Sequence, residues 1–69
     1  MGFAEIRKKH GYTQQHLAGL LGVSQSTVAQ WENGQSTPTM KHLLKLTSIF
    51  NIDLAELVAS FKKNRSATA

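Results

Sequence analysis

Residues 22–34, GVSQSTVAQWENG, place amide and hydroxyl side chains at helical spacing with hardly any charge among them. On a helical wheel of about 100° per residue, Ser26, Gln30 and Asn33 gather on one side, opposite Val28. Amides and hydroxyls both donate and accept hydrogen bonds. Base edges in the major groove of DNA present the same mixture, and a glutamine can bind adenine through two hydrogen bonds. The pattern favours a helix that reads DNA, although an ordinary polar surface would look similar.

Other chemistries find less support in the sequence. His10, His16 and His42 lack the spacing of metal ligands, so we expect no metal site. We expect these histidines to be solvent-exposed, with a phosphate contact by His16 as an alternative. No nucleophile turn or glycine-rich phosphate loop surrounds any serine or histidine, so we expect neither an enzyme nor a cofactor. Trp31 falls on the inward side of its helix, which makes it a core residue rather than a platform for stacking bases.

Composition limits the protein to a few classes. A chain of 69 residues suffices for one small domain. There is no cysteine, and no apolar run approaches the length of a membrane span or signal peptide, so we expect a cytoplasmic protein and no membrane partner. The formal net charge is +4, and this excess of positive charge favours polyanionic partners.

The elements that must position the polar side chains are all helical. Strand-like alternation is missing, and glycine, proline and capping residues separate five helical segments, so the sequence predicts an all-α fold. The predicted segments are residues 2–10, 13–21, 24–33, 40–51 and 54–64. The fourth carries the widest apolar face and is expected to be the most buried. We expect one domain over residues 1–61 and a basic, disordered tail over residues 62–69.

Only Val23 separates the glycine that ends the second segment from the serine that caps the third. A turn this tight requires the two helices to cross steeply, which is the arrangement of a helix-turn-helix. In that arrangement the second helix of the pair enters the major groove.

Together these residues resemble the lambda-repressor-like, Cro/Xre family of helix-turn-helix domains over about residues 3–58. The positions that carry the resemblance are Arg7, Gln14, Leu17, Ala18, Gly22, Val23, Ser24, Val28, Glu32, Asn33, Gly34, Pro38 and Leu43. The resemblance implies a compact five-helix domain whose second and third helices form the helix-turn-helix.

The resemblance also assigns roles to individual residues. Residues that would read bases are Gln25, Ser26 and Gln30. Residues that would contact the DNA backbone are Gln14, Ser24, Thr27, Asn33, Gln35 and Ser36. Arg7 and Glu32 would form a structural ion pair. The apolar stripe of Ile52, Leu54, Val58 and Phe61 would contact a second subunit, with a place in the core as the alternative. Gln35 and Thr39 are neutral where basic versions of the family carry cations. Phosphate binding would therefore depend more on Lys8, Lys9, Lys41, Lys62, Lys63 and Arg65.

The function implied is sequence-specific DNA binding by a transcriptional regulator. We expect a repressor that binds a palindromic operator in double-stranded DNA as a homodimer, with the third helix in the major groove. The alternative is an antitoxin or coactivator module that uses the same fold to hold a protein partner. The chain would be either a complete small regulator or the N-terminal module of a longer repressor.

Overall fold

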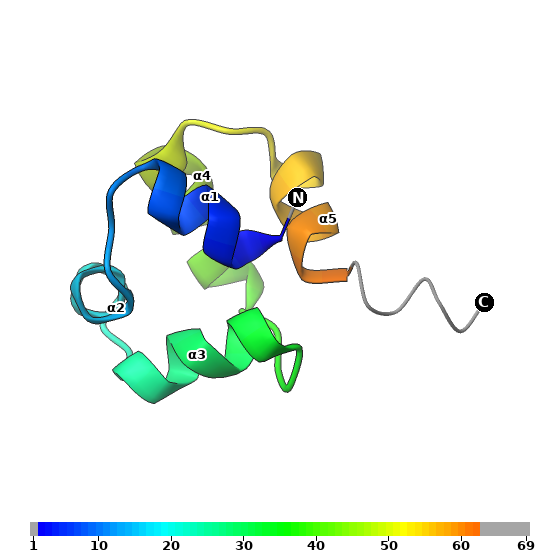
Figure 1. Ribbon diagram of the computed structural model, residues 1–69. Coiled ribbons are helices and arrows are strands. Elements are labelled where there is room, and N and C mark those ends of the chain that lie inside the picture. The colour runs from blue at the N-terminus through cyan, green and yellow to red at the C-terminus, as the bar shows by residue number, and fades with distance from the viewer. Residues whose placement is uncertain (1, 63–69) are drawn as a thin grey trace.

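The computed structural model describes residues 2–62, and side chains up to residue 61, as an arrangement of five helices (Figure 1). The helices are α1 (Phe3–Lys9), α2 (Gln14–Leu21), α3 (Gln25–Asn33), α4 (Met40–Phe50) and α5 (Leu54–Lys62). No strand occurs between residues 2 and 62, so the all-α prediction is confirmed. None of the helices in this range is long and apolar enough to cross a membrane. Apart from the backbone of Lys62, the tail predicted over residues 62–69 lies outside the described residues.

The starts of α2 and α3 are fixed by hydroxyl caps. Thr13 Oγ1 accepts a hydrogen bond from the His16 backbone N–H at 3.0 Å, and Ser24 Oγ accepts one from the Thr27 N–H at 3.2 Å. Each cap satisfies an N–H group that has no partner within the first turn of the helix. Both helices therefore begin where the sequence predicts.

A residue with left-handed backbone conformation lies at or just beyond the end of each of the first four helices. These residues are Gly11, Gly22, Gly34 and Asn51. At Gly22, with φ of 73°, the chain turns back so that the Val23 N–H donates to the Ala18 carbonyl at 3.0 Å. Only Gly22 and Val23 therefore lie between the last residue of α2 and Ser24, the N-cap of α3. Figure 1 shows the result: α2 is seen almost end-on while α3 lies across the view, so the two helices cross steeply.

An aromatic cluster around Phe3 holds the other helices together. The Phe3 ring stacks on Phe61 with centroids 4.6 Å apart and meets Phe50 at 5.9 Å and Trp31 at 6.4 Å, both edge-on. These four rings come from α1, α5, α4 and α3. Stacked and edge-to-face rings add to the stabilisation that apolar burial provides. Leu17, Ala18 and Leu21 complete the core from α2.

The prediction that α4 is the most buried helix is wrong. Leu46 and Phe50 are buried, but the side chains of Met40 and Leu44 are 56% and 55% exposed. Residues four apart lie on the same side of a helix, and this side of α4 faces away from its neighbours. In so small a domain α4 packs mainly against α5 and cannot cover its whole apolar circumference. Thr39 begins α4, but its hydroxyl lies 3.1 Å from His42 Nδ1 and caps no N–H group.

Gly19, inside α2, and Gly22, which caps its end, allow a matched test of this turn. A methyl group at Gly19 or Gly22 would meet no atom within 4 Å, so only the backbone conformation distinguishes them. We expect Gly22→Ala to lower the free energy of unfolding by about 1–2 kcal/mol, because alanine is strained in the left-handed conformation. Gly19→Ala should raise it by about 0.5–1 kcal/mol, because alanine favours the helix interior. Urea unfolding followed by circular dichroism measures both, and effects of equal sign would contradict the assignment.

Candidate nucleic-acid interface

Helix α3 divides into a buried side and an exposed polar side. Val28 has no exposed surface and Trp31 is 4% exposed, so both belong to the core. Gln25, Ser26 and Gln30 are exposed. The helix runs along the edge of the molecule (Figure 1). All three residues expected to read bases are therefore accessible.

The first turn of α3 carries a small hydroxyl network. Ser24 Oγ lies 3.1 Å from Ser26 Oγ and 2.9 Å from Thr27 Oγ1, in addition to its bond to the helix backbone. Ser24 and Ser26 are exposed, whereas Thr27 is half-buried. Hydroxyls can donate and accept at once, so these groups retain hydrogen-bonding capacity toward a ligand.

A buried ion pair joins α1 to the end of α3. Arg7 Nε donates to Glu32 Oε2 at 2.6 Å and Arg7 Nη2 donates to Oε1 at 3.3 Å, in the two-pronged geometry of a strong charge-assisted contact. The side chains are only 9% and 8% exposed. Arg7 Nη1 also donates to the Tyr12 carbonyl at 2.7 Å. One guanidinium therefore ties together α1, the loop before α2, and α3.

A second connection, from Glu32 to α2, escaped the sequence analysis. Gln14 Nε2 donates to Glu32 Oε1 at 2.9 Å, and Gln25 Nε2 donates to Gln14 Oε1 at 3.3 Å. Gln14 was expected at the DNA backbone and Gln25 at a base. No local signal links residues 14, 25 and 32, because their proximity depends on how α2 and α3 cross.

The exposed surface around α3 is electrically neutral. Between residues 24 and 39 the only charged side chain is Glu32, and it is paired inward with Arg7. The loop after α3 contributes Gln35, which is exposed, and Ser36, which is half-buried. Asn33, also expected at the backbone, is exposed at the end of the helix. The exposed lysines of the described residues lie on α1 and α4, namely Lys8, Lys9, Lys41 and Lys45. The side chains of Lys62, Lys63 and Arg65 lie outside the described residues.

The three histidines occupy separate places. His10 follows α1 with Nδ1 2.8 Å from the Ile6 carbonyl, while His16 lies on α2 and His42 on α4. The His16 ring lies 5.2 Å from that of Tyr12. Among the described residues, no three His, Asp or Glu side chains are grouped as metal ligands.

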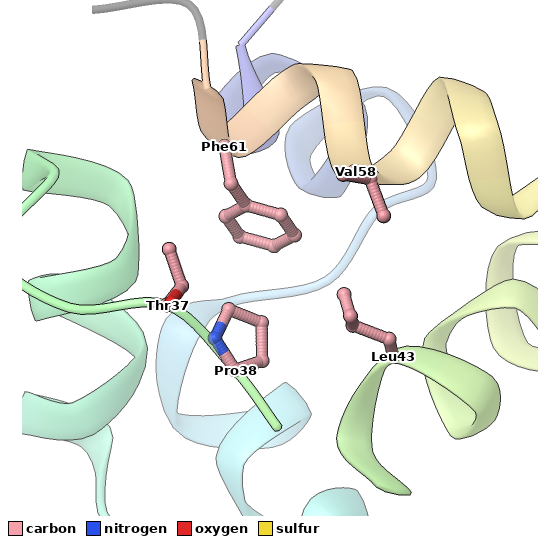
Figure 2. Close-up of a pocket in the computed structure, with 5 residues that line it drawn as sticks. All are labelled: Thr37, Pro38, Leu43, Val58 and Phe61. Atoms are coloured by element: carbon pink, nitrogen blue, oxygen red, sulfur yellow. The ribbon is translucent and has the colours of Figure 1, made fainter. Parts of the chain in front are cut away.

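An apolar pocket of about 170 Å³ lies where the loop after α3 meets α4 and α5 (Figure 2). Its lining residues are Thr37, Pro38, Leu43, Val58 and Phe61. Of the expected dimer contacts, Ile52, Leu54 and Val58 are half-buried. Phe61 is 7% exposed because it stacks on Phe3, so most of its surface is already used by the core.

The amino-acid sequence of this chain is similar to those of known proteins. A helix-turn-helix family model matches residues 3–57. The chain is 35% identical over 63 residues to the HTH-type transcriptional regulator AnsR of Bacillus subtilis, covering 91% of this chain and 54% of AnsR. It is 34% identical over 53 residues to an HTH-type transcriptional regulator of Archaeoglobus fulgidus, covering 77% and 76%. It is 31% identical over 55 residues to the HTH-type transcriptional activator BcrR of Enterococcus faecalis, covering 80% and 27%.

The chain therefore spans about half the length of AnsR, and 18% or less of several similar regulators from Pyrococcus and Thermococcus. These proteins are named as transcriptional regulators and none as an enzyme. No solved structure matches the chain significantly.

The ion pair generates a stability prediction. We expect Glu32→Ala to lower the free energy of unfolding by about 3–5 kcal/mol, because it leaves the Arg7 charge buried without its partner. The double variant Arg7→Met/Glu32→Leu should recover most of this loss, because it removes both charges and fills the space. Thermal and urea unfolding measure the two variants. A Glu32→Ala protein with the melting temperature and DNA affinity of the wild type would refute the role assigned to this pair.

Proposed function

This chain belongs to the helix-turn-helix family of DNA-binding transcriptional regulators, and we propose that it binds a palindromic operator as a homodimer and represses transcription. In this proposal α3 enters the major groove and α2 lies across the DNA backbone. The protein acts in the cytoplasm, where the operator DNA of a bacterial or phage-infected cell lies.

The observation that carries the proposal is the exposed, uncharged side of α3. Gln25, Ser26 and Gln30 project from a helix whose opposite side is locked into the core by Val28 and Trp31. Neutral amides and hydroxyls match the alternating donors and acceptors of base edges, whereas a carboxylate there would be repelled by phosphate. We assign base reading to these three residues.

Backbone contacts come from the residues around them. The set consists of Gln14, Ser24, Thr27, Asn33, Gln35 and Ser36, all of which carry amide or hydroxyl groups suited to phosphate oxygens. Lys8, Lys9 and Lys41 supply the long-range attraction, which falls as salt rises because bound lysines displace the counterions of DNA. The neutral residues orient the protein on the duplex, and the lysines bring it there.

The homodimer is proposed to form through the apolar surface of α5. Ile52, Leu54 and Val58 are partly exposed, and Val58 opens onto the pocket beside the loop that follows α3. A contact there lies near the end of α3, so a twofold axis would place two recognition helices about one helical turn, ~34 Å, apart on the DNA.

Repression follows if the operator overlaps a promoter, because a bound dimer then excludes the polymerase. BcrR, one of the similar proteins, is named an activator, so the sign of regulation is a separate question from DNA binding. A reporter gene with the selected operator placed across its promoter tests this step: expression should fall when the protein is present, and a rise would contradict the repressor role.

Gln30 provides the first test of base reading. Selection of bound sites from random duplexes should return two inverted half-sites, and Gln30→Ala should relax the preference at one base pair in each. The loss should be about 5- to 150-fold in discrimination, equivalent to the ~1–3 kcal/mol of a two-bond contact. Gln15→Ala is the matched control, since it removes an exposed amide from α2 rather than α3. An identical binding profile for the wild type and Gln30→Ala would count against the assignment.

Val58 provides the test of the dimer. Val58→Glu places a charge in the proposed contact and should weaken self-association at least about tenfold, because burying an unpaired charge costs more than 1.4 kcal/mol. Ala59→Glu introduces the same charge on the exposed side of α5 and should leave association unchanged. Sedimentation equilibrium measures both, with circular dichroism to verify folding. Equal self-association of the two variants would show that Val58 is not part of the dimer contact.

A further inference from the structure

Hydrogen bonds connect Glu32 to Gln14 and Gln14 to Gln25. The charge of Glu32 determines which atom is the donor in each of them. Glu32 is ion-paired with Arg7, and an ionised carboxylate can only accept hydrogen bonds. The Gln14 atom 2.9 Å from Glu32 Oε1 must therefore be the amide nitrogen, Nε2. The Gln14 oxygen then points to the other side, where only a donor can meet it.

That donor is the Gln25 side chain. Gln25 Nε2 lies 3.3 Å from Gln14 Oε1, so the nitrogen of the Gln25 amide is turned toward α2. Its oxygen and its second N–H have no partner in this chain of bonds, and the side chain is exposed. The second N–H of Gln14 is likewise outside the chain, so Gln14 retains a donor for a phosphate.

We propose that Glu32 is a positioning residue for base recognition: acting through Gln14, it sets the sense in which Gln25 presents its amide and thereby favours adenine opposite Gln25. The inference rests on the proposed function, since it requires α3 to lie in the major groove. Adenine is the base whose groove edge offers an acceptor beside a donor, N7 and N6, to which one amide binds through both its groups.

The reason that Glu32 matters lies in what an amide would do in its place. In Glu32→Gln one oxygen becomes an NH₂ group, and this group must face one of the two Arg7 donors, Nε or Nη2. The remaining oxygen keeps Arg7 Nε, the shorter contact at 2.6 Å, and the NH₂ group replaces Oε1, which lies 3.3 Å from Nη2 and faces Gln14. Gln14 must then turn its oxygen toward residue 32 and its nitrogen toward Gln25. Gln25 must reverse in its turn, so its donor and acceptor exchange places.

The experiment compares variants on the operator that the wild type selects from random duplexes. Dissociation constants are measured for every single-base substitution of one half-site. Glu32→Gln should lower the preference for adenine at the Gln25 position by about 2- to 10-fold, the equivalent of one net hydrogen bond. The preference at the position read by Gln30 should be unchanged. In a Gln25→Ala background, Glu32→Gln should have no further effect on that adenine.

Two more variants separate positioning from mere stability. Arg7→Lys weakens the ion pair but leaves the carboxylate to accept from Gln14, so it should lower stability while keeping the adenine preference. Gln14→Met keeps the ion pair and breaks the chain of bonds, so it should relax the same base position and weaken binding to all sequences through its lost phosphate contact.

The outcomes distinguish this inference from the proposed function. If Glu32→Gln and Arg7→Lys both weaken binding evenly at every base, Glu32 is only structural and the inference is overturned. An unchanged profile for folded Glu32→Gln or Gln14→Met overturns it as well, while leaving DNA reading by α3 intact. A wild type that prefers no base at any position would overturn the proposed function and this inference with it.

Discussion

The ion pair between Arg7 and Glu32 is the contact on which the arrangement of this domain depends. Removed from water, each charge is costly unless the other is present, so the pair tolerates one geometry. Because Arg7 also binds the Tyr12 carbonyl, that geometry fixes α1, the loop before α2, and the last turn of α3 relative to one another. A helix that reads bases, the role proposed for α3, has to be held in this way, since small displacements would separate its side chains from their targets.

The ion pair also neutralises Glu32, the one charged side chain between residues 24 and 39. Glu32 is drawn inward, and the remaining side chains from residue 24 to residue 39 are uncharged. The same carboxylate accepts a hydrogen bond from Gln14. The buried charge of Glu32 therefore favours one orientation of the exposed Gln25 amide, through the Gln14 side chain. In the proposed mode of base reading, stability and recognition both depend on Glu32 Oε1, which is why variants of this residue need readouts that separate the two.

A domain of this size leaves apolar surface uncovered. The aromatic rings around Phe3 draw four helices together, yet Met40 and Leu44 remain more than half exposed and Val58 borders an open pocket. These residues lie on α4 and α5, whereas the polar side of α3 contains no large apolar side chain. Among the described residues, exposed Leu20 on α2 is the exception to this separation of apolar surface from the polar side of α3.

The sequence by itself determined the helices, their caps and the two sides of α3, because these depend on neighbours within a few residues: Thr13 and Ser24 cap, Gly22 turns, and Val28 and Trp31 share a side. It also indicated the family, through residues at fixed spacing. Only the tertiary structure decided which apolar residues of α4 stay exposed, that Phe61 is buried in the core, and that Gln14 connects Glu32 to Gln25. These features join residues distant along the chain, so they are set by how the helices cross and pack, and no local pattern encodes that.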